Sequence, residues 1–329
     1  MKKTLITGGA GFIGYHLAKN LLANDYKVDL LDNFSRGVMD DELQMFSKEK
    51  NIKIINLDLS RTLSVEQIDN NYDYIFHLAA IVGVKHVMEN PYKVLDKNVI
   101  LNKNALSICG NQKKLSRFIF FSTSEVYAGT LQNFELTFPT EESTPLSLPN
   151  LKDRRTTYML SKIYGESMCH NAKVPFTIIR PHNFFGPRMG LSHVIPEIMK
   201  KIYDNKKGVV DVFSIDHKRT FCFIDDAVEI IRLLSESKLA KNEVYNVGVQ
   251  DEEIRIDELV NKIINIFGKD ISINPLPGTP GSPKRRCPSM VKAFKIIPYR
   301  HRFDLDKGLE LTLNWYEKNV FNGNQESAL

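Results

Sequence analysis

A short apolar run at the start of the chain opens onto a turn rich in glycine. Residues 4–7 lead directly into Gly8-Gly9-Ala10-Gly11-Phe12-Ile13-Gly14. Gly8, Gly11 and Gly14 allow a tight strand-to-helix turn, bare backbone for a pyrophosphate, and close packing of the helix on the strand. The helix N-terminus then offers free N–H groups and a partial positive charge to phosphate groups. The pattern therefore predicts a dinucleotide-binding turn.

The residues after this turn supply the context that it needs, because glycine spacing alone is a weak signal. Apolar residues recur at helical spacing over 13–21, and residues 27–31 are predicted to form a second strand. Asp32 ends that strand, where a carboxylate would accept hydrogen bonds from the adenosine ribose and repel a 2′-phosphate. This arrangement favours NAD over NADP, with a guanidinium at Arg36 as the group that could hold the phosphate instead.

Further buried strands are predicted at four places separated by helix-length segments: residues 52–57, 74–79, 118–122 and 176–179. Such alternation implies parallel crossovers and a sheet covered by helices on both faces. We therefore predict an α/β fold with a doubly wound parallel sheet of the Rossmann type. Residues 1–180 would form this NAD-binding domain, joined by a segment returning near 220–248, and residues 181–329 would form mainly a smaller substrate-binding lobe.

The second half of the chain has a less regular pattern. Amphipathic helices are predicted over 256–267 and 308–320, and the segment 274–283, rich in Pro and Gly, is predicted to be a loop. A mixed lobe built over the carboxyl ends of the strands would form a cleft there, where ligands of parallel sheets bind.

The charge balance argues against nucleic acid and membrane partners. The 44 basic and 39 acidic residues leave a net charge of only +5. The densest basic cluster, Lys284-Arg285-Arg286, is too short for a nucleic-acid surface. No apolar stretch approaches the ~20 residues of a membrane span. The glycine turn interrupts the apolar start before a signal-peptide core is complete, so we expect a cytoplasmic protein.

The four cysteines are spaced too far apart for a metal site or a redox pair. Cys109, Cys169, Cys222 and Cys287 form no C-x-x-C motif and have no histidine at ligand spacing. We therefore predict thiols in a reducing compartment, with no disulfide and no metal.

A tyrosine and a lysine four residues apart are the clearest candidates for chemistry. Tyr158 and Lys162 share one face if their segment is helical. An unperturbed tyrosine, with a pKa near ~10, is a poor base at neutral pH. A neighbouring Lys162 and a positive nicotinamide ring would favour the phenolate and make Tyr158 a base for a sugar hydroxyl. Thr123 could share that proton, although a lone Y-x-x-x-K match is more often structural.

Several motifs in order along the chain resemble one family. They are the glycine turn, Asp32-Asn33, His77-Leu78-Ala79-Ala80, the segment 122–127 (Ser-Thr-Ser-Glu-Val-Tyr), Tyr158 with Lys162, and the segment 180–188 (Arg-Pro-His-Asn-Phe-Phe-Gly-Pro-Arg). Together they resemble the extended short-chain dehydrogenase/reductases, and within these the nucleotide-sugar epimerases, dehydratases and decarboxylases. The resemblance extends from residue 3 to about residue 316.

The resemblance implies NAD as cofactor, a nucleotide-diphosphate sugar as substrate, and a homodimer formed through paired helices. The implied catalytic residues are Thr123, Tyr158 and Lys162, with Glu125 as a further acid/base candidate. The implied cofactor-binding residues are Gly8, Gly11, Phe12, Ile13, Gly14, Asp32, Asn33, Asp58, Leu59, Ala79, Ala80, Ser122, Tyr158 and Lys162. The implied substrate-binding residues are Asn183, His193, Arg219 and Arg286. Surface charges remain the alternative for the two arginines, and a capping or core role for His193.

Three features depart from the usual pattern of this family. Ala128 stands where glycine is usual, and Ser289 where aspartate is common. About ten extra residues lie between Tyr127 and Tyr158, over the expected sugar site. This insertion leaves the identity of the sugar open.

The resemblance implies a common first step, in which Tyr158 takes the C4 hydroxyl proton and C4 gives hydride to NAD. An epimerase would return the hydride to the other face of the 4-keto sugar. We favour a 4-epimerase, with a 4,6-dehydratase that uses Glu125 as the main alternative. A glucuronate decarboxylase, a C4 dehydrogenase that releases the 4-keto product, and a non-catalytic NAD-binding sensor remain open.

Overall fold

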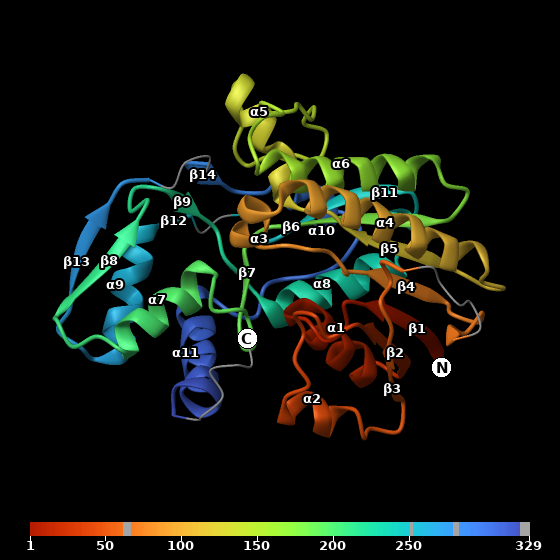
Figure 1. Cartoon of the computed structure of the whole chain (residues 1–329), viewed down its shortest axis with the longest axis horizontal. Helices are drawn as coiled ribbons and strands as arrows, with labels where there is room; N and C mark the ends of the chain where they lie inside the picture. The colour runs from red at the N-terminus through yellow and green to blue at the C-terminus, as the bar shows by residue number, and fades with distance from the viewer. Residues whose placement is uncertain (62–66, 251–252, 279–282, 323–329) are drawn as a thin grey trace.

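A seven-stranded parallel sheet forms the centre of the molecule (Figure 1). This computed structural model describes residues 1–61, 67–250, 253–278 and 283–322. The strands lie in the order β11-β6-β5-β4-β1-β2-β3. Their bounds are β1 (Lys2–Thr7), β2 (Tyr26–Asp32), β3 (Ile52–Asn56), β4 (Tyr74–His77), β5 (Arg117–Phe121), β6 (Phe176–Pro181) and β11 (Glu243–Val247). The predicted doubly wound α/β fold is confirmed.

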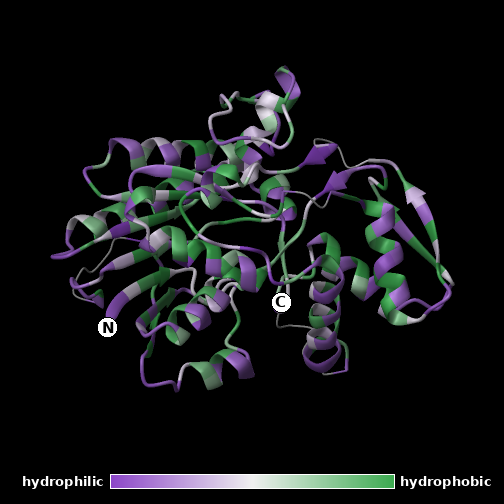
Figure 2. Ribbon diagram, turned by 180° about the vertical axis from the view of Figure 1, so that it is seen from behind, coloured by the Kyte–Doolittle hydropathy of each residue, from purple (hydrophilic) through white to green (hydrophobic). Residues whose placement is uncertain are grey.

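Helices cover both faces of this sheet, and its strands are therefore apolar on both sides (Figure 2). Leu5 and Ile6, neighbours in β1, belong to two separate clusters of buried side chains. The cluster on one face includes side chains of α4 (Pro91–Gly110), which packs beside α6 (Thr156–Asn171). The other includes α1 (Phe12–Ala23) and α8 (Ile224–Glu236).

The remaining helices of the amino-terminal half are short. They are α2 (Asp41–Phe46), α3 (Val84–Glu89), η2 (Ser124–Tyr127) and α5 (Ala128–Asn133). α5 begins the insertion and projects beyond α6 at the top of Figure 1.

The carboxyl-terminal half adds small sheets and helices beside the carboxyl ends of the central strands (Figure 1). The small sheets pair β7 (Phe184–Phe185) with β10 (Cys222–Phe223), β8 (Val209–Phe213) with β13 (Ser272–Leu276), and β9 (Lys218–Arg219) with both β12 (Ile254–Arg255) and β14 (Arg285–Arg286). The helices are α7 (Val194–Tyr203), η3 (Lys238–Ala240), α9 (Ile256–Phe267), α10 (Val291–Phe294), α11 (Leu305–Tyr316) and η4 (Glu317–Phe321). Within the described residues, no helix combines the length and apolar character needed to cross a membrane.

Two sequence expectations about this half were wrong in part. The predicted loop over 274–283 begins as the end of β13, which pairs in parallel with β8 through Pro275 and Val212. A strand with one neighbour tolerates proline, because its other edge makes no ladder hydrogen bonds. Residues 279–282 of that loop lie outside the described residues. The closing helix begins at Leu305 rather than at Gly308 and changes at residue 317 from α-helical to π-helical bonding.

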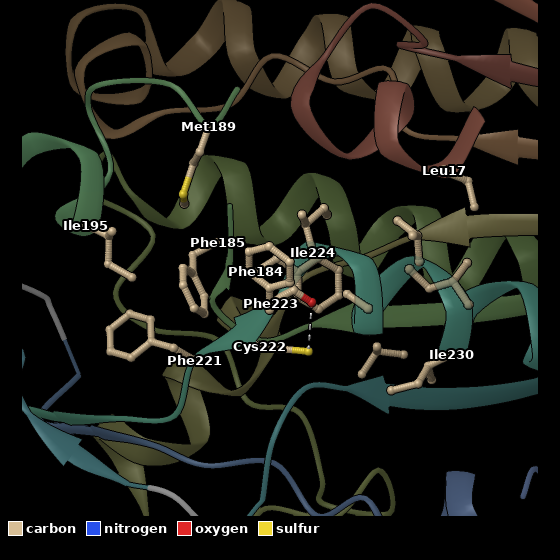
Figure 3. Packing of buried hydrophobic residues seen from close by; sticks show 14 of the residues in the cluster. Leu17, Phe184, Phe185, Met189, Ile195, Phe221, Cys222, Phe223, Ile224 and Ile230 are labelled. Carbon is tan, nitrogen blue, oxygen red and sulfur yellow. Dashed lines mark hydrogen bonds between the residues drawn. The ribbon is translucent and has the colours of Figure 1, made fainter. Parts of the chain in front are cut away.

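An aromatic cluster joins the central sheet to the added elements (Figure 3). The rings of Phe185 and Phe223 meet edge to face, with centroids 5.6 Å apart. Phe221 packs against Phe185 in the same way. One apolar cluster extends from Leu17 of α1, which Figure 3 labels, to α11. The predicted domain boundary near residue 180 would divide this continuous core, and the boundary stays a prediction.

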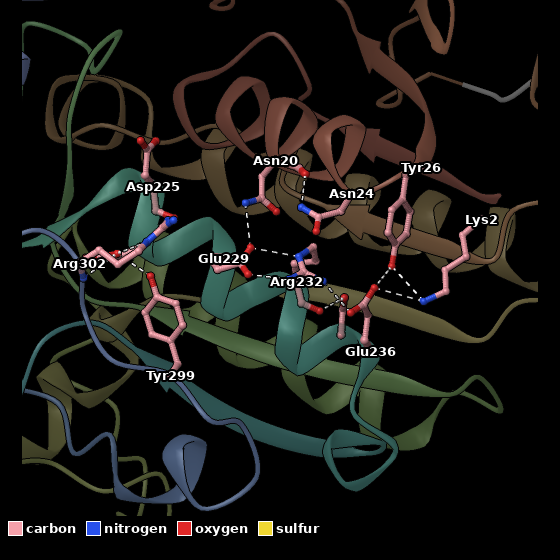
Figure 4. Close-up of polar contacts among 12 residues, drawn as sticks. Lys2, Asn20, Asn24, Tyr26, Asp225, Glu229, Arg232, Glu236, Tyr299 and Arg302 are labelled. Carbon is pink, nitrogen blue, oxygen red and sulfur yellow. Dashed lines mark hydrogen bonds and ion pairs between the residues drawn. The ribbon is translucent and has the colours of Figure 1, made fainter.

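A polar network fastens α8 to the first strands and helix (Figure 4). Tyr26 donates a hydrogen bond to Glu236, and Lys2 lies 3.2 Å from the same carboxylate. Arg232 bridges Glu236 and Glu229, at 2.8 Å and 2.6 Å. These contacts fix the end of α8 to the first residues of β1 and β2.

The buried ion pair between Glu166 of α6 and Arg180 of β6 ties several elements together. Two guanidinium nitrogens bind the carboxylate, at 2.7 Å and 2.9 Å, and each side chain is about 5% exposed. Glu166 also accepts a hydrogen bond from Ser122. Arg180 donates to the Tyr127 hydroxyl and to the carbonyl of Glu142 in the insertion. The pair thus connects α6, β5, β6 and the insertion.

Glu166→Gln should lower the free energy of unfolding by about 3 kcal/mol, because it leaves a buried guanidinium without its counter-charge. Urea denaturation at pH 7 measures the loss. The control is Asp306→Asn, which breaks the half-exposed pair with Lys262 and should cost below about 1 kcal/mol. Equal losses in the two variants would contradict the stabilising role of the buried pair.

Candidate active site

The glycine turn after β1 has the geometry that a pyrophosphate requires. Gly8 has a φ of +73°, which disfavours any residue with a Cβ, and its N–H donates to the Leu31 carbonyl at 2.8 Å. A Cβ at Gly14 would lie only 2.8 Å from the Cα of Gly9, so helix α1 could not approach the turn as closely. The helix begins with Gly11 as its N-cap and without a capping side chain or an acidic residue in its first turn. The turn therefore fits a dinucleotide phosphate.

Acidic side chains lie past two strands on the same edge of the sheet. Asp32 accepts backbone hydrogen bonds from Ala10 at 3.0 Å and Phe34 at 2.9 Å, and burial raises its pKa. Burial also acts to raise the pKa of Asp58, but the hydrogen bonds from Ser60, one of them at 2.9 Å, together with Arg61 and Asn33 outweigh it and the pKa falls. A carboxylate oxygen with one bond keeps a lone pair for a ribose hydroxyl.

Arg36 does not turn toward Asp32. Its guanidinium donates to the carbonyl of Val82 at 2.8 Å, in the segment that follows β4. It also interacts electrostatically with Tyr158 and His193. This placement removes the reason to expect a 2′-phosphate at Asp32, and Arg36 instead adds positive charge near Tyr158.

The other cofactor candidates line the same edge. Ala79 and Ala80 follow β4, and the Ala79 N–H lies 3.3 Å from the Thr7 hydroxyl. Ser122 follows β5, with its hydroxyl engaged by Glu166. Leu59 is buried in the apolar cluster under α4, whereas Asn33 is exposed. Phe12 and Ile13 form the first turn of α1. The cofactor-binding roles of all the residues in this paragraph stay predictions.

Tyr158 and Lys162 lie one turn apart on α6, so their predicted helical placement is confirmed. The Lys162 ammonium donates to the Phe121 carbonyl at 2.7 Å, at the end of β5. Thr123 begins η2, where its hydroxyl accepts the Glu125 N–H at 3.2 Å and also interacts with Tyr158. The structure therefore brings together the residues that the sequence argument grouped.

The electrostatics of Tyr158 differ from the sequence argument. Burial, and then the negative charge of Glu125, raise the pKa of Tyr158, whereas Thr123, Arg36 and Arg286 oppose the rise. Burial also lowers the pKa of Lys162 to about 8. Lys162 is directed at a backbone carbonyl, and the opposing charges come from Arg36 and Arg286, to which the sequence argument gave other roles.

Glu125 is half-buried between two arginines. Its carboxylate lies 3.1 Å from Arg286 and 3.3 Å from Arg155. Burial acts to raise its pKa, but the charges of Arg286 and then Arg155 prevail and lower it, so the carboxylate is ionised. Sequence reasoning missed Arg155. Its position three residues before Tyr158, at the N-cap of the same helix, was the available signal.

Arg219 and Arg286 face each other across β9 and β14. Burial, and then the charges of Arg286 and Arg155, lower the pKa of Arg219 to about 9. Arg219 donates to the carbonyls of Lys218 and Pro283, so backbone contacts hold it in place. Two cationic side chains at paired positions of adjacent strands suit an anionic ligand, whose negative charge would relieve the repulsion between them.

The last two substrate candidates lie on either side of β7. Asn183 has a φ of +43° and donates to the Thr220 carbonyl at 2.8 Å, in the segment that joins β9 to β10. His193 is the N-cap residue of α7 without a capping hydrogen bond from its side chain. Burial and Arg36 lower its pKa. His193 thus holds the capping position that was the alternative, without a side-chain capping bond, and its ligand role stays a prediction.

All four cysteines are buried free thiols, as the spacing predicted.

The glycine turn after β1, Asp32 at the end of β2 and the Tyr158–Lys162 pair on α6 form the arrangement expected of a dinucleotide-dependent enzyme of the dehydrogenase type. The sequence profile described as "NAD dependent epimerase/dehydratase family" matches residues 4–248. The chain belongs to that family, whose members act on nucleotide sugars with NAD.

Two curated relatives match over most of the chain. A UDP-N-acetyl-alpha-D-glucosaminuronate decarboxylase from Bacillus cytotoxicus is 30% identical, over 96% of this chain and 98% of its own length. UDP-glucuronic acid decarboxylase 2 from Arabidopsis thaliana is 28% identical, over 99% of this chain and 71% of its own length.

Among the solved structures similar to this chain is one that contains both NAD and a nucleotide sugar. The UDP-glucuronic acid 4-epimerase from Bacillus cereus, in complex with UDP-glucuronic acid and NAD, has a TM-score of 0.84 at 28% identity. The match covers 96% of this chain and 99% of that one. NAD is accordingly the cofactor. The membership of this family that the sequence motifs predicted is confirmed.

Gly14→Ala should abolish retention of NAD through purification, because the added methyl group collides with the turn. The measurement is the nicotinamide nucleotide released on denaturing the purified protein. Gly110→Ala is the control, since a Cβ there meets no atom within 4 Å. Wild-type NAD content in Gly14→Ala would mean that the turn does not contact the cofactor.

Proposed function

We propose that this protein is a decarboxylase of a UDP-linked hexuronate, acting through oxidation at C4. The observation that carries the proposal is the ionised Glu125, held by Arg155 and Arg286 beside Tyr158. With Arg219, the cluster contains three cations and one carboxylate. Two positive charges are therefore in excess, and Arg36 near Tyr158 adds a third, so that the three match the two charges of a diphosphate and the one of a sugar carboxylate.

The first step would use Tyr158 as the base. The phenolate would take the proton of the C4 hydroxyl, with Thr123 beside it as a second hydroxyl in the proton path. Lys162, fixed on the Phe121 carbonyl, would supply positive charge at the foot of the site. When bound, NAD supplies the hydride acceptor for C4 and later the hydride donor.

The second step follows from the chemistry of the 4-keto sugar. A C6 carboxylate is then β to a ketone, so the C5–C6 bond can break with loss of CO₂ while its electron pair becomes an enolate. A proton at C5 gives a 4-keto pentose, which return of hydride converts to the UDP-pentose. Glu125 would favour this loss, because repulsion between two carboxylates disappears when one leaves as neutral CO₂.

The two curated relatives support this choice, since both are named as decarboxylases of UDP-uronates and align over nearly the whole chain. They weigh against the 4-epimerase that sequence reasoning favoured. Epimerisation remains the second candidate, because the structurally similar enzyme from Bacillus cereus is a 4-epimerase of UDP-glucuronic acid. Both candidates share the uronate substrate and the C4 oxidation.

Incubation with UDP-glucuronic acid labelled with ¹³C at C6 separates the two candidates. A decarboxylase releases the label as CO₂, whereas an epimerase retains it in UDP-galacturonic acid, and NMR distinguishes these products. Release of no label, with formation of UDP-galacturonic acid, would overturn the decarboxylase in favour of the epimerase.

Glu125→Gln should reduce the rate of CO₂ release by about 10-fold or more, because it removes the repulsion that favours the loss. Oxidation at C4 should continue, so a labelled 4-keto acid or its epimer should accumulate. Glu141→Gln is the control, since this exposed carboxylate of the insertion has no contact with the arginines. An unchanged rate of CO₂ release in Glu125→Gln would show that Glu125 does not promote the loss of CO₂.

Tyr158→Phe should lower kcat by roughly 10²- to 10⁴-fold, the usual contribution of a general base. The binding of UDP-glucuronic acid should change little, because the ring keeps its packing. Single-turnover kinetics and calorimetric titration measure the two quantities. Tyr164→Phe, an exposed tyrosine on the same helix, should leave both at wild-type values. Near wild-type kcat in Tyr158→Phe would place the base on another residue.

A further inference from the structure

Arg36 forms a bridge between the segments that follow the two neighbours of β1. In the central sheet, β1 lies between β4 and β2, and Thr7 at its end pairs with His77 and with Leu31. Arg36 follows β2, and its guanidinium donates at 2.8 Å to the carbonyl of Val82, which follows β4. The bridge therefore crosses the carboxyl end of β1, where the glycine turn begins.

The two segments that the bridge joins both pack directly on the glycine turn. On the side of β2, a Cβ at Gly37, next to Arg36, would lie 2.6 Å from the Cβ of Ala10 in the turn. On the side of β4, a Cβ at Gly8 would lie 2.8 Å from the backbone nitrogen of Ala79. The turn is thus flanked on both sides by the segments from which the bridge extends.

The Val82 end of the bridge is anchored to the helix that contains Tyr158. Ile81 donates its N–H to the side chain of Asn98, on α4, at 2.7 Å and accepts a hydrogen bond from the same amide at 3.2 Å. The Asn98 amide also donates to the Ser161 hydroxyl at 3.2 Å, and that hydroxyl donates to the Tyr158 carbonyl at 2.6 Å. This end of the bridge is therefore fixed relative to α6.

The Arg36 end of the bridge is held by one contact. The side chain is exposed, and among the described residues the Val82 carbonyl is the one hydrogen-bond partner of its guanidinium. Exposed side chains change rotamer within nanoseconds once such a bond breaks. The charge of Arg36 acts on Tyr158 and His193, so its guanidinium lies toward the expected site of the sugar chemistry. The bridge can therefore open at Arg36 without any change in the backbone.

We propose that Arg36 and Val82 form a strap across the path of the cofactor, which must open each time NAD enters or leaves. A dinucleotide bound at the carboxyl ends of these strands extends from Asp32 past the glycine turn toward Tyr158. The bridge crosses the end of β1 between these two residues. A cofactor that takes a hydride and returns it in one turnover does not need to leave, so slow exchange costs no activity. This last reason rests on the proposed function, whereas the strap itself does not.

A strap has a kinetic signature that a direct contact with the cofactor lacks. The bond joins two groups of the protein, so its loss should lower the barriers to release and to binding alike. Arg36→Met keeps the length of the side chain and removes its donors. Bound NAD should then exchange with labelled NAD about 10-fold faster, whereas the dissociation constant of NAD, measured by equilibrium dialysis, should stay within about 2-fold.

Two further variants control this comparison. Arg36→Lys keeps a donor at similar reach and should restore most of the slow exchange. Arg154→Met is the matched control, because this exposed arginine also donates to a backbone carbonyl after β4, that of Met88 at 2.5 Å. Its bond joins α3 to the segment before α6 and does not cross β1, so exchange in Arg154→Met should keep the wild-type rate.

The strap is overturned if NAD exchanges at the wild-type rate in Arg36→Met. It is also overturned if the dissociation constant rises as much as the exchange rate, because Arg36 would then be a direct ligand of the cofactor. Binding of NADP by the wild type that is lost in Arg36→Met would instead assign Arg36 to a 2′-phosphate. None of these measurements uses a sugar nucleotide. Failure of the strap is therefore distinguishable from failure of the decarboxylase, which the release of labelled CO₂ tests.

Discussion

The ion pair of Glu166 and Arg180 is the interaction on which the arrangement of the site depends. Glu166 lies one helical turn after Lys162 on α6, and Arg180 lies at the end of β6, so their bond sets the helix against the sheet. Because both charges are buried, neither side chain has an alternative partner in water. The same guanidinium holds Tyr127 and the carbonyl of Glu142. Helix α6, the edge of the sheet and the insertion are thus positioned by one pair of charges.

The charges around Tyr158 come from parts of the chain that are far apart. Arg36 follows β2, Arg155 begins α6, and Arg286 belongs to β14. Their positive charges offset the cost of burying the negative charge of the Glu125 carboxylate or of a Tyr158 phenolate. An anionic substrate would complete this cluster, which explains how cations can be concentrated in a partly buried site without a permanent counter-ion for each.

The parts of the site that could be predicted from sequence are local. Gly8, Gly11 and Gly14 belong to one turn, and Tyr158 and Lys162 to one helical face, so spacing alone brings them together. The contacts of Glu125 with Arg155 and Arg286 join segments 30 and 161 residues apart, and no periodicity reports such a meeting. The start of the expected loop at 274–283 is a strand because a neighbouring strand, not its own proline content, decides its conformation.

The backbone bonds of Thr140 to Cys287 and Ser289 have a consequence for the exchange of parts between related enzymes. The insertion is a continuous stretch of chain, yet its inner edge is completed by residues almost 150 positions later. Moved alone into a relative, it would carry an N–H and a carbonyl that no longer find their counterparts. The two stretches are therefore coupled in the structure, and a chimaera should exchange both or neither.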